Sequence, residues 1–429
     1  DINFSGFEKV QLGDGQNVAS VSSSAAGNVD GGNGYDTLAT GNLNVALNGN
    51  GSGNVGNLNF SGFEQVTGNN NGSVSVNGNA SVASSRAGSV GSTSFSGINN
   101  LTGSGTADTL NTNSNVSITG NGAGSVNDIN FSGFEKVQLG DGQNVVNQNA
   151  TGVTTSIDGG AGHDTFNTTN SSDRISINSS AQQNGISGFE VINTLGGDDE
   201  ITLNGSTISL NLDAGSGKDS LSSTVASGEA LTISVANQGT LGQVRFSNIE
   251  NVTLGSGADT ATIAANAGTL NMGAGNDSIT LNSGATGIIN AGDDNDSATI
   301  NATAAGNLNM GTGIDTVTLT STTATTTINA GDDADTLNAQ TGSINSTLNI
   351  TAANAGTLDA ASFSNFETIN MDGGVDTATI AANTGTLNMG TGNDSITLNN
   401  GATGTINAEA GDDSATINAT AAGNLNMGT

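Results

Sequence analysis

Short segments of alternating apolar and polar residues fill this chain. SITLN at 278–282 and ATINA at 298–302 each place every second side chain on one face, which is the pattern of a half-buried β-strand. Gly, Asn, Asp and Thr separate these segments, and the spacing of an amphipathic helix is absent from the sequence. The pattern predicts an all-β protein built from many short strands.

The strands recur with a regular period. Aspartates close Gly-rich turns at Asp259, Asp277, Asp296, Asp315 and Asp335, and their residue numbers differ by 18, 19, 19 and 20 in turn. One period holds two short strands, a Gly/Asn/Thr turn and a Gly–Asp turn. A unit of this size cannot bury its apolar face alone, so neighbouring units must stack. We therefore predict a parallel β-solenoid, a β-roll or β-helix with about 19 residues per coil and a ladder of Gly–Asp turns along one edge.

Longer repeats are superimposed on this period. The segment that starts at Asp259 recurs from Asp376, an offset of 117, and the segment from Asp1 recurs from Asp128, an offset of 127. These repeats lie near 1–127 and 128–200, and near 259–375 and 376–429. Because both ends fall within repeats, we predict that residues 1–429 are one continuous solenoid window of a longer repeat protein.

Composition narrows the possible partners. The chain has 65 Gly, no Pro, no Cys and 3% aromatic residues, which suits a thin core between closely spaced strands. A formal charge of −32 leaves no basic surface for nucleic acid. Such an acidic chain is expected to neutralise itself with cations. No apolar run is long enough to span a bilayer as a helix, and disulfides are excluded.

The aspartate at the end of the Gly-rich turn is the candidate functional residue. Asn is frequent in this chain, so a slot that only had to cap a turn would hold Asn about as often as Asp. Asn occupies the slot only at Asn17 and Asn144, and LGGDDE leaves it ambiguous between Asp199 and Glu200. Asp108 belongs to the slot if its turn, GSGTAD, carries one inserted residue. The candidate metal ligands are the aspartates in this slot: Asp36, Asp108, Asp164, Asp219, Asp259, Asp277, Asp296, Asp315, Asp335, Asp376, Asp394 and Asp413.

Stacking these aspartates has an electrostatic cost. Two carboxylates about 4.8 Å apart repel by roughly 3–4 kcal/mol at an effective dielectric constant near 20. A cation between them removes the repulsion, and carboxylate and carbonyl oxygens favour Ca²⁺. We expect the glycines to let the turn backbone aim its carbonyl groups at the ion.

The turns resemble a known calcium-binding repeat. GGNGYDTL at 31–38 and GGAGHDTF at 159–166 fit the nonapeptide G-G-x-G-x-D-x-U-x and are similar to the RTX (repeats-in-toxin) proteins. This resemblance implies a β-roll with Ca²⁺ along its edges, and it is closest to giant bacterial adhesins, surface-layer proteins and extracellular filaments. In the family each coil has two such turns. Here the second turn, as in NNGATG, lacks the aspartate, so calcium would line one edge only.

Three functions are weighed. The first is a secreted structural protein at the bacterial cell surface, an adhesin, surface-layer or filament segment that folds on meeting extracellular calcium. The second is a carbohydrate- or ice-binding module, for which the Thr-rich segment 316–327 is the best candidate. The third, a β-helical polysaccharide-active enzyme, is disfavoured because Lys and Arg are scattered and His163 and Tyr35 lie in variable turn positions. We expect no enzymatic activity.

A second marker is the motif FSGFE, at Phe60 and Phe131, with a copy at Phe4 and variants at Phe95, Ile186, Phe246 and Phe363. We interpret it as a specialised coil in which the Phe side chains pack inside and the Gly or Asn makes a bend.

Self-association is the expected partnership, either end to end or through covalent continuation into a filament. The cell surface or a polysaccharide is the alternative partner.

Overall fold

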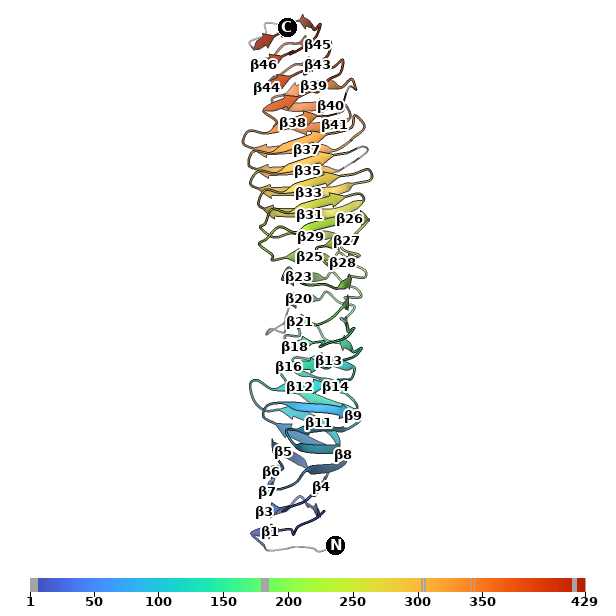
Figure 1. The fold of residues 1–429 in the computed structure, drawn as a ribbon, viewed down its shortest axis with the longest axis vertical. Coiled ribbons are helices and arrows are strands. Elements are labelled where there is room, and N and C mark those ends of the chain that lie inside the picture. The colour runs from blue at the N-terminus through green and yellow to red at the C-terminus, as the bar shows by residue number, and fades with distance from the viewer. Residues whose placement is uncertain are drawn as a thin grey trace. The chain divides into compact units, whose positions relative to one another are not determined.

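The computed structural model describes residues 7–178, 185–301, 304, 306–340, 342, 344–418 and 423–428. The described residues form an all-β fold with a mostly parallel sheet, which confirms the predicted β-solenoid (Figure 1). They include no helix with the length and apolarity that a membrane crossing requires. The FSGFE copy at Phe4 lies outside the described residues.

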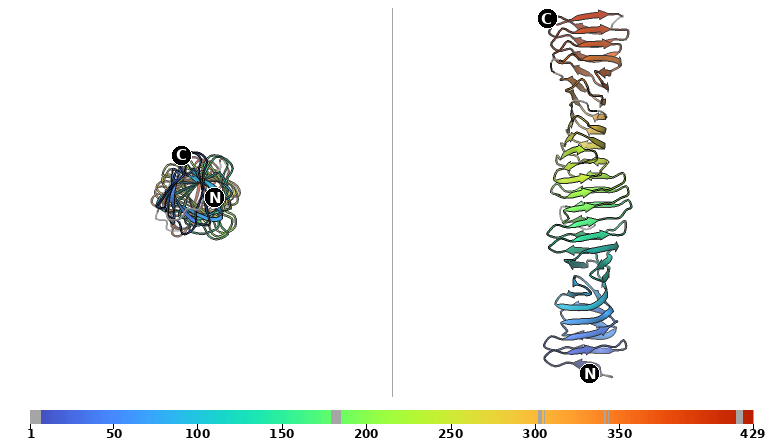
Figure 2. Two further views of the ribbon diagram at one scale, coloured as in Figure 1. Left: turned by 90° about the horizontal axis from the view of Figure 1, so that it is seen from below. Right: turned by 90° about the vertical axis from the view of Figure 1, so that its right-hand side faces the viewer.

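The strands divide between two compact units. The first comprises Asp1–Asp199 and Leu210–Gly215, and the second comprises Glu200–Ser209 and Ser216–Thr429. Within each unit the strands stack one above another, as Figure 2 also shows from the side.

The strands of the first unit are β1 (Lys9–Gln11), β2 (Val18–Ser20), β3 (Ala26–Asp30), β4 (Thr37–Gly41), β5 (Asn44–Gly49), β6 (Ser52–Val55), β7 (Asn57–Ser61), β8 (Gln65–Val76), β9 (Ala80–Ser84), β10 (Ala87–Val90), β11 (Thr93–Gly103), β12 (Thr109–Thr112), β13 (Val116–Gly120), β14 (Ala123–Val126), β15 (Ile129–Ser132), β16 (Lys136–Leu139), β17 (Val145–Gln148), β18 (Ser156–Asp158), β19 (Thr165–Asn167), β20 (Arg174–Asn178), β21 (Ile186–Ser187), β22 (Val191–Asn193) and β24 (Asn211–Asp213).

The strands of the second unit are β23 (Glu200–Asn204), β25 (Ser220–Ser223), β26 (Ala230–Val235), β27 (Gln238–Leu241), β28 (Val244–Ser247), β29 (Asn251–Thr253), β30 (Thr260–Ile263), β31 (Asn266–Ala274), β32 (Ser278–Leu281), β33 (Thr286–Asp293), β34 (Ser297–Ile300), β35 (Asn307–Thr312), β36 (Thr316–Leu319), β37 (Thr327–Asp332), β38 (Thr336–Ala339), β39 (Thr347–Ala352), β40 (Ala355–Leu358), β41 (Ala361–Ser364), β42 (Thr368–Asn370), β43 (Thr377–Ile380), β44 (Asn383–Asn388), β45 (Ser395–Leu398), β46 (Thr403–Asn407), β47 (Ser414–Ile417) and β48 (Asn424–Asn426).

The sequence period sets the strand register of the solenoid, because a strand of the repeating coil pairs with the strand one period away. In the second unit, β30, β32, β34, β36 and β38 form one parallel series, in which Thr260 pairs with Ser278 and Ser278 pairs with Ser297, each one sequence period further on. The strands β29, β31, β33, β35 and β37 form the other side of each coil. Alternation then places Ile279 and Leu281 in the core, while Ser278 faces outward.

Antiparallel insertions interrupt this parallel pattern, and the sequence did not predict them. Five three-stranded meanders occur among the described residues: β5–β6–β7, β9–β10–β11, β13–β14–β15, β26–β27–β28 and β39–β40–β41. The third strand of each carries the first residue of an FSGFE-type motif. A coil that contains a meander is therefore longer than the plain sequence period, as the parallel pairing of Thr37 with Gln65 shows.

The motif packs as the sequence indicates. Phe60 and Phe63 are 3% and 0% exposed, with ring centroids 6.1 Å apart in an edge-on arrangement. Gly62, between them, has φ +68°, the left-handed bend expected at that position. In the neighbouring strand β6, a Cβ at Gly53 would lie 2.6 Å from the Phe60 ring, so glycine there leaves room for the aromatic side chain.

Candidate functional site

The turn aspartates lie inside the solenoid wall. All of the predicted metal ligands except Asp413 are at most 2% exposed, and Asp413 is half-buried. Their carboxylates are fixed from the neighbouring coil. The backbone N–H of Asp259 donates to Asp277 Oδ1 at 2.7 Å, and that of Asp277 donates to Asp296 Oδ1 at 2.8 Å. One oxygen of each carboxylate thus ties two successive coils together.

These hydrogen bonds connect the carboxylates into columns, each running along one stretch of coils. The longest, the long column, is Glu229, Asp259, Asp277, Asp296, Asp315, Asp335 and Glu367. A second column in the same unit joins Ser346, Asp376, Asp394 and Asp413, and a short one joins Asp219 to Glu250. In the first unit the columns are Asn17–Asp36–Glu64, Gly78–Asp108–Glu135, Asn144–Asp164–Glu190 and Asp173–Asp199.

The second oxygen of most column aspartates is buried without a hydrogen bond. This holds for Oδ2 of Asp36, Asp164, Asp259, Asp277, Asp296, Asp315, Asp335, Asp376, Asp394 and Asp413. Asp108 differs, because Gly78 N–H donates to its Oδ1 and Gly105 N–H to its Oδ2. A buried anionic oxygen without a donor is costly. These ten aspartates therefore have the chemistry of a cation or proton acceptor, and Asp108 does not.

Burial also changes the acidity of these groups. Loss of solvent raises the pKa of Asp296 to about 7; the nearby Asp277 and Asp315 carboxylates raise it too, and the Asp277 N–H hydrogen bond lowers it. Burial is likewise the main cause that raises the pKa of Asp277 and of Asp335 to about 6. The ionised form of the long column is therefore destabilised unless a cation or a proton compensates its charge.

The columns are files, with one carboxylate per coil. Among the described residues, no three acidic or histidine side chains converge on one point as a metal cage. A cation in a column would therefore be shared between carboxylates of successive coils, with backbone carbonyls or water completing its ligands. The unengaged Oδ2 atoms fit this role by their chemistry and burial.

Close packing between successive coils explains why the turns contain glycine. A Cβ at Gly292, where φ is +124°, would lie 1.8 Å from the carbonyl oxygen of Gly273 in the preceding coil. At Gly311, with φ +111°, it would lie 1.9 Å from the Gly292 carbonyl oxygen. Only glycine allows the turn backbones to approach this closely with positive φ.

Asparagine occupies the slot only where a column begins. Asn17 and Asn144 donate their backbone N–H to Asp36 and Asp164, and their side-chain amides donate to Gly13 and Gly140 carbonyls of their own turns. The ambiguous LGGDDE turn resolves to Asp199, which is 1% exposed and accepts the Asp173 N–H at 2.8 Å.

Sequence reasoning missed the residues that end the columns. The last residue of the FSGFE-type motif accepts the N–H of the final aspartate: Glu64 from Asp36, Glu135 from Asp108, Glu190 from Asp164, Glu250 from Asp219 and Glu367 from Asp335. A signal was present, because each of these glutamates is followed two residues later by an apolar residue that begins a strand core, as each turn aspartate is. Asp173 and Glu229 were missed as well.

The sequence matches no protein-family model, and a search of curated proteins found no match. The resemblance of the turns to RTX repeats therefore stays a prediction.

Proposed function

We propose that this chain is a structural segment of an extracellular protein, of the adhesin, surface-layer or filament type, whose carboxylate columns bind calcium. The observation that carries the proposal is the series of buried Oδ2 atoms without a hydrogen bond along the long column. Repeating this feature coil after coil is what a scaffold requires, because each coil then gains the same link to the next.

Calcium suits these ligands better than a transition metal. The long column offers only hard carboxylate oxygens, and the single histidine of the sequence, His163, belongs to the other unit. The residues that would hold the ion in the second unit are Asp259, Asp277, Asp296, Asp315, Asp335, Asp376, Asp394 and Asp413. The ion would supply the positive charge that offsets the repulsion between successive carboxylates.

The net charge of −32 fits folding that depends on the environment. A chain this acidic repels itself and stays soluble when calcium is scarce. Extracellular calcium modules have dissociation constants of about 10⁻⁴–10⁻³ M, so the columns would fill only outside the cell. Binding to the folded state alone then stabilises the fold by mass action.

The test is circular dichroism of the chain while Ca²⁺ is raised from chelator to about 10 mM, with Mg²⁺ as control. We expect Ca²⁺ to raise the melting temperature, with a cooperative gain of β-structure at temperatures near the melting point in chelator. Mg²⁺ should do neither, because its small size demands stricter octahedral geometry. A chain that is fully β-structured in chelator, with an unchanged melting temperature in Ca²⁺, contradicts the calcium part of the proposal. The aspartates would then serve only as acceptors between coils.

A second candidate function, binding to ice or to a carbohydrate surface, is favoured by one outward face of the second unit. Thr262, Thr280, Thr299 and Thr318 form an in-register file across β30, β32, β34 and β36. A regular lattice of hydroxyl groups matches a periodic ligand. In the Thr-rich segment 316–327, by contrast, residues 320–326 lie outside the strands. Replacing Thr299 with Tyr should abolish any inhibition of ice recrystallisation or retention on insoluble polysaccharide; activity that survives the substitution excludes this face.

A further inference from the structure

The five meanders share a turn whose side chain differs between copies at one position, the residue 13 positions before the last motif residue. We call it the tip residue. It is Gly51, Arg86, Gly122, Asn237 or Asn354, and each has a positive φ between 51° and 73°. Its carbonyl accepts the N–H of the fourth motif residue, as Gly122 does from Phe134 at 3.2 Å. The backbone of the tip is therefore the same in all five copies, and the tip side chain is what varies.

In three copies the tip side chain donates to the last motif residue. Asn237 Nδ2 donates to Glu250 Oε1 at 2.7 Å, and Asn354 Nδ2 donates to Glu367 Oε1 at 2.9 Å. In the third, Arg86 Nη1 donates to the Oδ1 of Asn99, which replaces the glutamate. In the two glutamate copies, an N–H donor from the tip thus satisfies the oxygen that the column leaves over.

The two glycine copies lack this donor. Glu64 and Glu135 still accept the N–H of Asp36 and Asp108 through Oε2, at 2.8 and 2.7 Å. Their Oε1 atoms accept no hydrogen bond from the described residues. Glu135 is the more accessible of the two, since it is exposed and Glu64 is half-buried.

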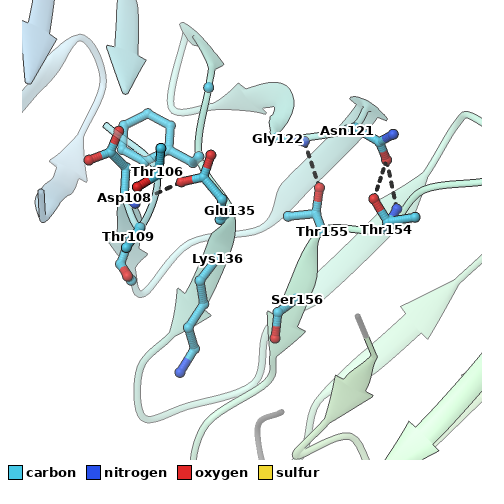
Figure 3. A pocket seen from close by; sticks show the side chains of 13 residues that line it. Thr106, Asp108, Thr109, Asn121, Gly122, Glu135, Lys136, Thr154, Thr155 and Ser156 are labelled. Carbon is cyan, nitrogen blue, oxygen red and sulfur yellow. Dashed lines mark hydrogen bonds between the residues drawn. The ribbon is translucent and has the colours of Figure 1, made fainter. Parts of the chain in front are cut away.

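At Glu135 the missing side chain coincides with a cavity of about 650 Å³ (Figure 3). This volume accommodates a small molecule. Thr106, Thr109 and Ser156 line it together with Glu135. Lys136 also lines it, with Nζ 3.9 Å from Asp158 Oδ2, an ion pair that engages the ammonium group away from Glu135.

Hydrogen bonds join the tip of the meander, at one wall of the cavity, to residues 154 and 155. Gly122 N–H donates to Thr155 Oγ1 at 2.6 Å, and the N–H and hydroxyl of Thr154 donate to Asn121 Oδ1 at 2.6 and 3.2 Å (Figure 3). The Asp108 carboxylate, 1% exposed, is fully used by two backbone N–H groups. Glu135 Oε1 is therefore the acceptor that the cavity offers to a ligand.

We propose that this cavity binds a monosaccharide-sized molecule that carries an ammonium group and several hydroxyl groups, an amino sugar. The ammonium takes the place on Glu135 Oε1 that the tip side chain takes in the other copies. A charged donor is favoured over a neutral one because a hydrogen bond between ions is roughly twice as strong. The hydroxyl groups of the ligand face Thr106 and Thr109. This site does not depend on calcium in the columns.

Saturation-transfer NMR of the full chain tests the proposal, with glucosamine, glucose and butylamine as probes. We expect transfer to glucosamine to exceed that to glucose, which lacks the ammonium, and to butylamine, which lacks the hydroxyl groups. Glu135→Gln keeps the Asp108 N–H acceptor and removes the charge, so transfer to glucosamine should fall several-fold.

The tip residue provides matched variants. Gly122→Asn supplies the amide from within the chain and should abolish the transfer, while Gly51→Asn, at a tip that does not line this cavity, should leave it unchanged. A Cβ at Gly122 would lie 2.7 Å from Phe134 O, so the backbone must shift slightly, and an unchanged circular dichroism melt verifies the fold. Transfer that survives in Gly122→Asn, or that Gly51→Asn abolishes, or that is equal for glucose and glucosamine, or absent in the wild type, overturns the proposal.

Discussion

At the scale of single residues, the column aspartate uses its two oxygens differently. Oδ1 of Asp296 accepts the Asp277 N–H at 2.8 Å, which is a bond any acceptor of this shape could make. Oδ2 is buried without a hydrogen bond, and it carries the need for a counter-charge. Exchanging the carboxylate for an amide separates these two contributions.

We expect Asp296→Asn and Asp296→Ala to behave in opposite ways in chelator. Asn keeps the acceptor and removes a buried charge, so its melting temperature should equal or exceed that of the wild type. Ala leaves the Asp277 N–H unsatisfied, at a cost of about 1–3 kcal/mol. In Ca²⁺ the wild type should gain stability over both variants. Thermal melts followed by circular dichroism provide the measurement, and an Asn variant as unstable as Ala in chelator would show that the charge itself stabilises the column.

At the scale of elements, the sequence predicted the repeating coil but not the meanders. The strands around Thr260 and Ser278 follow from alternation and a constant period, both of which are local signals. A meander such as β39–β40–β41 depends on antiparallel pairing between strands that look like any others in the chain. The meander is joined to its column through Glu367, which accepts hydrogen bonds from both Asp335 and Asn354. These residues are up to 32 positions apart in the sequence, so a local pattern does not reveal the contact.

The candidate site was likewise predictable only in part. The aspartate slot was readable because its charge recurs where Asn would suffice for a turn. Burial of the carboxylates, and the donation of each backbone N–H to the next coil, depend on how coils stack, so sequence spacing alone could not show them. Glu135 was hidden for the same reason, because its unengaged oxygen becomes evident only when Gly122 at its tip is compared with Asn354, which donates to Glu367 in another copy.

The glutamate that ends each FSGFE-type motif should link its meander to its column through hydrogen bonds. Glu367→Ala removes the acceptors of two donors, the Asp335 N–H at 3.0 Å and the Asn354 amide at 2.9 Å. We expect hydrogen exchange in β39–β41 and at the Asp335 amide to accelerate by about tenfold or more, because each lost buried bond costs about 1–3 kcal/mol. Asn354→Gly removes one donor only, as at Gly122, and should leave the Asp335 amide protected. Equal exchange in both variants would contradict this role for the glutamate.

At the scale of the whole molecule, charge and folding are linked through pH. Burial raises the pKa of Asp277, Asp335 and Asp376 to about 6 and that of Asp296 to about 7, above the ordinary value of 3.8. The folded chain therefore binds more protons than the unfolded chain between these values. Stability that the protonated columns provide is fully present below about pH 4 and is lost as pH rises through about 6 to 7.

In chelator, the melting temperature should consequently fall by about 5 °C or more between about pH 5 and about pH 8. About 10 mM Ca²⁺ should remove or reverse this fall, because the ion takes over at high pH the compensation that protons give at low pH. Repeating the series in concentrated KCl is the control, since salt screens surface charges far more than buried ones. A melting temperature that rises from pH 5 to pH 8 in chelator would mean that the columns stay ionised without a cation. If the fall persists unchanged in Ca²⁺, protons rather than calcium are the natural partners of the columns.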